Sequence, residues 1–290
     1  MDFQLTDDQR ALKAGVRELL ARRFDSAALR AAADGGGLDR GLWRALGEAG
    51  FFALRLPEEA GGVGLGLPEA VLLFEEAGRA LLPGPLIATQ LAAGLVEGAA
   101  EGDTVVTAPD GGLVEWLAEA DVVRGDVTGA QPIRSADPLT PLHRLPAGGD
   151  GGPSERALLT AAEQLGSAGR TTETAVQYAR EREQFGQPIG AFQAVKHLCA
   201  RMLVRTEVAR AAVYAAAVTG DPVEIAGAKL LADEAAVRCA RDCLQVHGGM
   251  GFTWEAEVHL HLKRAWLRRE RWPATARAQE LQAAALEEAM

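Results

Sequence analysis

The sequence predicts a mainly α-helical protein, with an N-terminal helical domain, a reduced β segment in the middle and a C-terminal four-helix bundle. Apolar residues recur at helical spacing in both terminal parts of the chain. Short β-branched runs separated by turn residues are confined to the middle. The hydrophobic fraction of 48% is ordinary for a globular protein and allows a large core. We place the three parts at residues 1–100, 101–153 and 154–290.

Composition excludes several classes of protein. A net charge of −10 and a pI near 5.1 argue against a nucleic-acid groove, which needs a basic face. The acidic start at residues 1–8 is unlike a signal or transit peptide. The longest uncharged stretch, residues 80–96, is too short to span a membrane. Three cysteines suit a reducing compartment, so we expect a cytoplasmic protein that binds neither nucleic acid nor membrane.

The N-terminal part contains three clear helix signals. Thr6 and Gln9 have the spacing of a capping box, and apolar residues follow over 12–20 with a 3.6-residue period. A second helix covers residues 42–49 and stops at Gly50. A third begins near Leu67, and its apolar run over 71–74 predicts a helix buried on all sides.

The middle part contains β-branched runs at 104–108 and 120–123, with turn signals at 109–112 and 148–153. Its length allows about five or six short strands, which is too few for a closed barrel of about seven or eight. The segment around Trp116 is expected to form a short helix. The sequence therefore predicts a small, incomplete β module.

The C-terminal part predicts long antiparallel helices joined by short loops. The first begins at Ser154 and ends near Arg180, the second is marked by apolar residues over 192–203, and the third covers 225–246. Glycines at 248–251 end the third helix as a C-cap does.

Residues 180–197 are the most informative string, with a helix end, a Gly/Pro-stiffened turn and a new helix start. Arg182, Gln184 and Phe185 lie where backbone N–H groups are unpaired, an arrangement that suits a pyrophosphate beside a planar ring. The alternative is a turn with an ion-paired Arg and a core Phe.

A second string covers residues 245–252, where Gly248 and Gly249 would permit close backbone approach to a phosphate or ribose. The alternative is a helix cap without a ligand. No strand precedes it and it lacks G-x-G-x-x-G, so it is not a Rossmann fingerprint. His247 is interpreted as a packing or surface residue.

No metal site is predicted. Cys239 and Cys243 share a helix face, but they lie in an apolar helix, where free cysteines behave as small hydrophobes. His259 and His261 lie two positions apart on a helix and so face different directions.

Together these strings resemble the signatures of acyl-CoA dehydrogenases. The residues that carry the resemblance are Arg182-Glu183-Gln184-Phe185-Gly186-Gln187-Pro188-Ile189 with Phe192-Gln193, and Gln245 with Gly248-Gly249-Met250-Gly251-Phe252. Two N-terminal strings, over 42–64 and 75–79, resemble the first helical domain of the same family. The resemblance covers nearly the whole chain except residues 101–153.

The resemblance implies a helical–β–helical subunit that forms dimers, paired into tetramers, with FAD across the dimer interface. It implies α,β-dehydrogenation of an acyl-CoA thioester, in which a carboxylate removes the α proton and the flavin accepts hydride. The residues implied to contact the adenosine and pyrophosphate of the flavin are Arg182, Gln184, Phe185, Gln193, Gln245, Gly248 and Gly249.

The sequence departs from the family in two places. Nothing between residues 101 and 153 resembles the family's segments that hold the isoalloxazine ring. The usual position of the catalytic Glu falls at residues 272–274, Trp-Pro-Ala. Glu270 nearby is flanked by Arg268, Arg269 and Arg271, so it is interpreted as a solvated ion-pair residue. At the alternative position, the start of the third-domain helix, Arg156 occupies the matching place and Glu155 precedes it, which makes Glu155 the one weak candidate base.

We therefore predict a subunit of a heteromeric acyl-CoA dehydrogenase, paired with a full-length homologue as an α2β2 heterotetramer. The partner would supply the base and the acyl-CoA pocket. Such heteromers act in actinobacterial steroid catabolism, which implies a bulky, steroid-derived CoA thioester and a β-oxidation step. Two alternatives stay open: a complete homomeric enzyme that uses Glu155, and a non-catalytic scaffold that has lost FAD.

Overall fold

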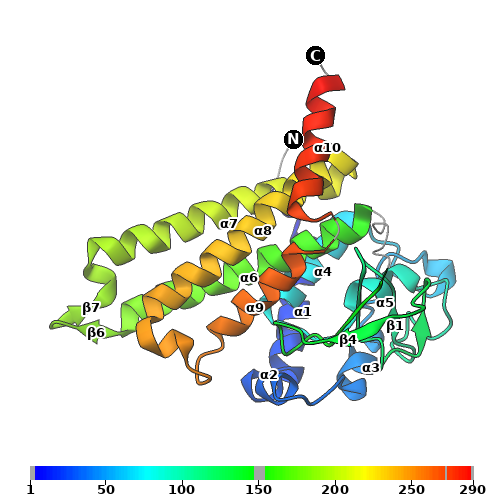
Figure 1. Cartoon of the computed structure of the whole chain (residues 1–290), viewed down its shortest axis with the longest axis horizontal. Helices are drawn as coiled ribbons and strands as arrows, with labels where there is room; N and C mark the ends of the chain where they lie inside the picture. Colours follow the sequence, from blue (N-terminus) through cyan, green and yellow to red (C-terminus); the bar gives the residue numbers. More distant parts are fainter. Residues whose placement is uncertain (1–3, 147–153, 272, 289–290) are drawn as a thin grey trace.

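The computed structural model describes residues 4–146, 154–271 and 273–288, and Figure 1 shows the chain as an elongated bundle with smaller helices and a β segment at one end. The N-terminal elements are α1 Asp7–Arg23, α2 Ser26–Ala33, α3 Arg40–Glu48, the 3-10 turn η1 Glu58–Ala60, α4 Leu67–Arg79 and α5 Leu86–Ala92. The middle strands are β1 Val106–Thr107, β2 Leu113–Glu115, β3 Val122–Val123, β4 Gln131–Ile133 and β5 Leu142–Arg144. The C-terminal elements are α6 Ser154–Glu181, β6 Glu183–Gln184, β7 Gln187–Pro188, η2 Ile189–Ala191, α7 Gln193–Thr219, α8 Pro222–His247, η3 Gly248–Phe252, α9 Val258–Arg269 and α10 Thr275–Glu288.

The three predicted N-terminal helices lie close to where the sequence places them, whereas α2 and α5 were not predicted. Thr6 caps α1 through a reciprocal capping box with Gln9, both hydrogen bonds being 3.1 Å long. The predicted helix over 42–49 is α3, and α4 begins at Leu67 with a proline in its first turn. Residues 71–74 of α4 are at most 2% exposed, which confirms a helix buried on all sides.

The β segment is small, as predicted. β2, β5 and β4 form an antiparallel sheet in that order, and β1 and β3 form a separate parallel pair. The predicted turn at 148–153 lies outside the described residues. The short helix expected around Trp116 is wrong, because Leu113–Glu115 is strand β2. Pairing of β2 with β5 overrides the helical pattern of the local sequence. The backbone N–H of Trp116 donates to the Pro141 carbonyl at 3.0 Å.

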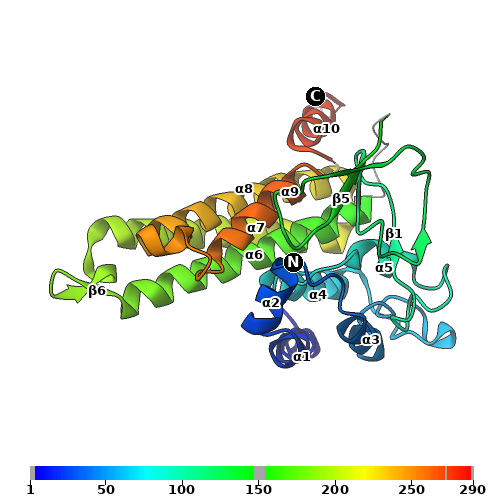
Figure 2. The same cartoon turned by 60° about the horizontal axis from the view of Figure 1, so that its bottom comes forward.

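The C-terminal part is the predicted bundle. α6, α7 and α8 run side by side along the long axis, with α9 against α6 and α8, and α10 packs on one end of α8 (Figures 1 and 2). Gly220 ends α7 in the left-handed conformation, and Asp221 caps α8 by accepting from Val223 and Glu224 N–H groups. This tight connection makes α7 and α8 antiparallel neighbours.

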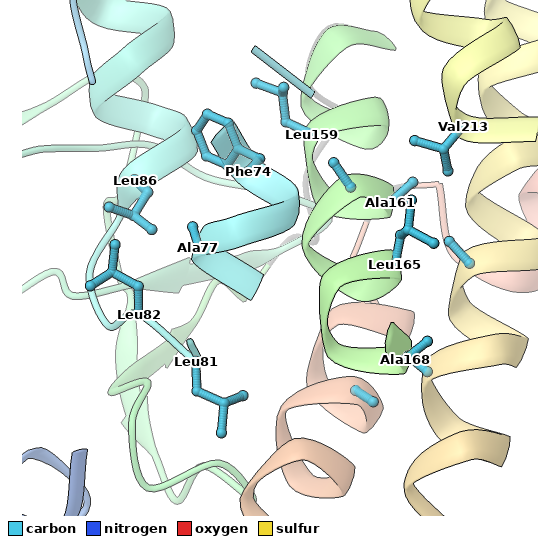
Figure 3. Packing of buried hydrophobic residues seen from close by; sticks show 14 of the residues in the cluster. Phe74, Ala77, Leu81, Leu82, Leu86, Leu159, Ala161, Leu165, Ala168 and Val213 are labelled. Carbon is cyan, nitrogen blue, oxygen red and sulfur yellow. The ribbon is translucent and has the colours of Figure 1, made fainter. Parts of the chain in front are cut away.

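Two glycines let the N-terminal domain lie directly on the bundle. A Cβ on Gly166 of α6 would lie 1.8 Å from the Glu75 carbonyl oxygen, and one on Gly78 of α4 would lie 2.0 Å from the Glu163 oxygen. The backbones of α4 and α6 therefore touch where they cross. Figure 3 shows the apolar side chains around this crossing, with Phe74 from α4 and Leu165 from α6.

A buried polar cluster ties α1, α4 and α7 together near the same crossing. Glu75 accepts from Lys13 at 2.6 Å and from the Tyr214 hydroxyl at 2.7 Å, and it also pairs with Arg210. Lys13 and Arg210 hold the pKa of the Glu75 carboxyl below its usual value despite burial, so this carboxylate stays charged.

Within the described residues, no helix combines the length and apolarity that crossing a membrane would need.

The close contact of α4 and α6 predicts that alanine substitutions at two glycines of α6 have different effects on stability. Gly166→Ala should destabilise the protein by about 3 kcal/mol or more, because the new methyl group has no room beside Glu75. Gly169→Ala, whose Cβ would meet nothing closer than 3.9 Å, should be neutral or stabilise by up to about 1 kcal/mol through helix propensity. Chemical denaturation of both variants measures the free energy of unfolding. Equal changes in the two variants would contradict the contact between the backbones of α4 and α6.

Candidate functional site

Residues 182–189 form a β-hairpin at the end of the bundle farthest from the β segment (Figure 1). β6 and β7 pair antiparallel, and the two residues between them, Phe185 and Gly186, have φ angles of 55° and 79°. Two positive φ angles are typical of a type I′ hairpin turn. The Ile189 N–H donates to the Arg182 carbonyl at 2.8 Å and closes the base of the hairpin.

The predicted binding side chains of this hairpin are exposed. Phe185 is 92% exposed and has only an edge contact with Phe192, at 6.1 Å between ring centroids. The Arg182 guanidinium is exposed and has no hydrogen bond or ion pair with any part of the chain that the structure describes. Gln184 bonds only the Glu183 carbonyl, at 2.7 Å. The alternative of a core Phe and an ion-paired Arg is therefore wrong.

The second predicted segment leaves an open stretch of backbone. α8 ends at His247, and Gly248 has φ 60° and ψ −138°, a conformation that favours glycine. A Cβ on Gly248 or Gly249 would meet no atom within 4 Å. Gln245 is exposed, and its side chain makes no hydrogen bond among the described residues, while its carbonyl accepts from the Gly248 N–H. The glycines do cap the helix, and they also leave one face of the backbone free.

A stacked pair of rings joins the two segments. Tyr178 of α6 and His247 of α8 stack with centroids 4.1 Å apart and planes 20° from parallel. The Tyr178 carbonyl accepts from the Arg182 N–H at 2.8 Å, and His247 Nδ1 lies 2.8 Å from the Cys243 carbonyl. His247 is thus a packing residue, as predicted. Both strings lie at the same end of the bundle.

Gln193 lies in the first turn of α7, one residue after Phe192. It is exposed, and its Oε1 lies 3.2 Å from His197 Nε2 of the same helix. This position is on the helix that follows the hairpin, so the structure brings Gln193 to the same end of the bundle as Arg182.

Glu155, the weak candidate base, lies in the first turn of α6, at the opposite end of that helix from Arg182. Both of its carboxylate oxygens accept from Arg55, each at 3.0 Å. These hydrogen bonds lower the pKa of the Glu155 carboxyl. A carboxylate held in a bidentate ion pair at lowered pKa is a poor general base.

The usual base position, residues 272–274, offers no carboxylate. Trp272 lies outside the described residues, Pro273 is buried, and Glu270 caps the end of α9 and is exposed, as predicted. Among the described residues Glu270 forms no ion pair, so the expected pairing with its neighbouring arginines is wrong.

Buried ion pairs occupy the region beside both base positions. Arg271, after α9, pairs with Glu115 of β2 and lies 3.6 Å from Asp110, while Arg268 pairs with Glu163 of α6 at 2.6 Å. The cavity that remains among these groups has a volume of about 10 Å³, room for one water molecule. The sequence predicts solvated arginines around Glu270, whereas the structure buries Arg268 and Arg271 in this cluster.

The described residues contain no group of three or more His, Cys, Asp or Glu side chains that could hold a metal ion. Cys239 and Cys243 are buried and unbridged, and burial raises the pKa of the Cys243 thiol to about 12. A thiol with a raised pKa is unreactive at neutral pH, so both cysteines are packing residues.

Comparison with known sequences identifies the family. Residues 6–101 match the description "Acyl-CoA dehydrogenase, N-terminal domain" and residues 154–283 match "Acyl-CoA dehydrogenase, C-terminal domain". Acyl-CoA dehydrogenase IpdE2 of Mycobacterium tuberculosis is 38% identical over 289 residues, covering 89% of this chain and 91% of that protein. The chain belongs to the acyl-CoA dehydrogenase family. IpdE2 of Mycolicibacterium smegmatis is 36% identical, covering 90% of this chain and 93% of that protein.

Solved structures share the acyl-CoA dehydrogenase fold. The Tcur3481-Tcur3483 steroid ACAD G363A variant superposes with a TM-score of 0.83 at 23% identity, covering 98% of both chains. The ChsE4-ChsE5 complex of Mycobacterium tuberculosis gives 0.81 at 23% identity, covering 100% of this chain and 99% of that one. Butyryl-CoA dehydrogenase of Megasphaera elsdenii gives 0.84 at 20% identity, covering 99% and 100%. At sequence identities of 20–23% the similarity to these structures shows a shared fold alone.

Membership places the chain among FAD-dependent oxidoreductases that act on acyl-CoA thioesters. The two matched regions leave out residues 102–153, the segment in which the sequence departs from the family.

Glu155→Gln separates a structural role from a catalytic one. At pH 7 it should lower stability by no more than about 1 kcal/mol, because the Arg55 pair is part-exposed. The lowered pKa means that this contribution is present above pH ~4.5 and is lost as pH falls through the folded-state value. Turnover of the purified enzyme should fall by less than about tenfold, whereas loss of a general base costs ~10²–10⁴. A thousandfold loss with flavin still bound would make Glu155 the base.

Proposed function

We propose that this chain is one subunit of a heteromeric FAD-dependent acyl-CoA dehydrogenase, paired with a full-length homologue as an α2β2 heterotetramer. This chain supplies the adenosine and pyrophosphate side of the flavin site, and the partner supplies the base and the acyl-CoA pocket. The observation that carries the proposal is the exposed Phe185 and an Arg182 guanidinium without a partner among the described residues, both near an open glycine backbone. The same chain has Trp-Pro-Ala at the usual base position.

The residues at the end of the bundle fit the ADP half of FAD. Arg182 offers a free guanidinium that can donate to a pyrophosphate oxygen, and Gly248 and Gly249 let the ligand approach the backbone. Phe185 offers an exposed ring face to a planar group. When bound, FAD would accept the β hydrogen of the thioester as hydride.

Each remaining residue of the set has a matching task. Gln245 is exposed beside the glycines and can donate or accept through its amide. Gln193 and Gln184 present amides on either side of Phe185 in the chain, where their groups can orient the ligand. None of these amides is needed to complete a buried network of this chain.

The far end of α6 supports the assignment of catalysis to the partner. Beside the usual base position a groove of about 810 Å³ is open, but residues 272–274 there are Trp-Pro-Ala and carry no carboxylate. Arg156, which takes the place of the alternative base, donates to the Pro109 carbonyl, and a guanidinium cannot act as a base at neutral pH.

An apolar stripe on α7 supports a partner subunit of the same family. Its members are exposed and recur at helical spacing, namely Leu203, Val204, Val208, Ala211 and Val218. The opposite face of α7 is buried against α6 and α8, so this helix is apolar on both sides. Exposed apolar faces of this kind mark interfaces, and a homologous bundle offers a matching one.

The substrate is proposed to be a bulky, steroid-derived acyl-CoA. Support comes from a structural relative described as a steroid ACAD made of two named chains, Tcur3481 and Tcur3483, and from the two-component ChsE4-ChsE5 complex.

The first prediction concerns flavin content. Purified alone, the chain should hold little or no FAD, and co-purified with its partner subunit it should give about one FAD per pair of chains, because each flavin needs both subunits. Absorbance of the released flavin against protein concentration measures the ratio. A yellow homomer with one flavin per chain would favour the homomeric alternative, and a complex without flavin would favour the scaffold.

Arg182→Ala should weaken FAD retention in the complex by about ten- to a hundredfold, since a hydrogen bond to a charged group contributes ~1.5–3 kcal/mol. Arg180→Ala is the matched control, because Arg180 is also exposed near the end of α6 and lacks a partner among the described residues. Equilibrium dialysis of the flavin and thermal melting of both variants measure the effect. Equal flavin affinity in the two variants would remove Arg182 from the site.

A further inference from the structure

A second cavity lies away from both the hairpin end and the ion-paired base region. It has a volume of about 380 Å³ and is enclosed by α1, α2, the end of α4, the middle of α6 and the start of α9. Figure 2 shows α1 and α2 below the bundle on this side. Cavities of this size are typical of small-molecule sites.

The acidic residues of this cavity already have hydrogen-bond or ion-pair partners within the chain. Glu76 accepts two hydrogen bonds from Arg17, at 2.8 and 2.7 Å. Asp25 caps α2 through the Ala28 N–H at 2.9 Å, and Glu257 accepts from the Ser26 hydroxyl and lies 3.8 Å from Arg30. These carboxylates therefore do not oppose an incoming anion strongly.

One cationic side chain of the cavity, that of Arg170, lacks a hydrogen-bond or ion-pair partner among the described residues. Arg79 pairs with Glu173 and Arg17 with Glu76, but the Arg170 guanidinium makes no hydrogen bond or ion pair with the described parts of the chain. Arg170 also lines the neighbouring groove along α6, so it lies at the mouth of the cavity.

The inner wall combines a neutral ring with apolar side chains. His261 is 6% exposed, and its Nδ1 lies 2.8 Å from the Ser167 hydroxyl. Burial and the charges of nearby arginines, Arg170 first among them, lower the pKa of His261 to about 3, so the ring is neutral. The apolar wall consists of Leu20, Phe24 and Leu29, all buried.

We propose that this cavity binds an amphipathic monocarboxylate, with the carboxylate at Arg170 and the apolar body against Leu20, Phe24 and Leu29. A single free guanidinium matches a single negative charge, and its planar fork suits a carboxylate. A phosphate dianion would require more cations than the cavity offers. The neutral His261 lines the inner wall without adding a second positive charge.

This inference is independent of the proposed flavin site, because none of its residues belongs to the hairpin or to the glycine segment. Loss of the carboxylate site should leave FAD content and flavin absorbance unchanged. Conversely, Arg182→Ala should leave carboxylate binding at Arg170 unchanged.

Isothermal titration of the purified complex with octanoate tests the site, with octanamide as the uncharged probe of the same shape. Wild-type protein should bind octanoate saturably. It should bind octanamide at least about tenfold more weakly. Arg170→Gln should weaken octanoate binding about tenfold and leave octanamide unchanged. Ala21→Trp, an exposed position at the rim of the cavity, should abolish binding of both.

Arg201→Gln is the matched control, since Arg201 is exposed on α7 and makes no bond among the described residues. It should bind octanoate as the wild type does. Absence of saturable octanoate binding, equal affinity for the two probes, or equal effects of Arg170→Gln and Arg201→Gln would each overturn the proposal.

Discussion

The contact of α4 with α6 is the constraint on which the rest of the structure depends. At Gly78 and Gly166 the two backbones touch, because neither position carries a side chain. This crossing fixes the N-terminal helices on the bundle, and with them the walls of the cavity around Arg170. α6 itself is about 42 Å long at 1.5 Å per residue. It therefore separates the ion-paired base region at Glu155 from the exposed hairpin at Arg182.

Buried charge fixes the reduced β segment on the bundle, in addition to Val105 and Leu139, which belong to the hydrophobic core. Arg264 pairs with Asp137 at 2.6 Å and donates to the Leu82 carbonyl, so one guanidinium joins α9, the β segment and the chain after α4. Such a pair adds little net stability compared with apolar packing, but removal of one partner is costly. These pairs specify where the short strands lie on the bundle.

Local chemistry explains what could be predicted from the sequence. The Thr6 capping box, the buried run in α4 and the strings around Arg182 and Gly248 are each read from neighbouring residues. The errors involve partners far away in the chain. Trp116 follows a strand because β2 pairs with β5, and Arg268 and Arg271 are buried because Glu163 and Glu115 meet them there. A single sequence does not reveal which distant carboxylate will neutralise an arginine.

Backbone strain distinguishes Phe185 from the other residues with unusual conformations. Leu81, Trp116 and Phe185 all have φ near 55°, a conformation that costs roughly 1–2 kcal/mol for a residue with a side chain. Leu81 is 0% and Trp116 3% exposed, so packing within the chain offsets their strain. Phe185 is 92% exposed and gains almost no burial in return. A contact outside the chain would offset this strain. The flavin proposed above would supply one, since it carries a planar ring for Phe185 and an anionic group for the Arg182 guanidinium, which has no partner among the described residues.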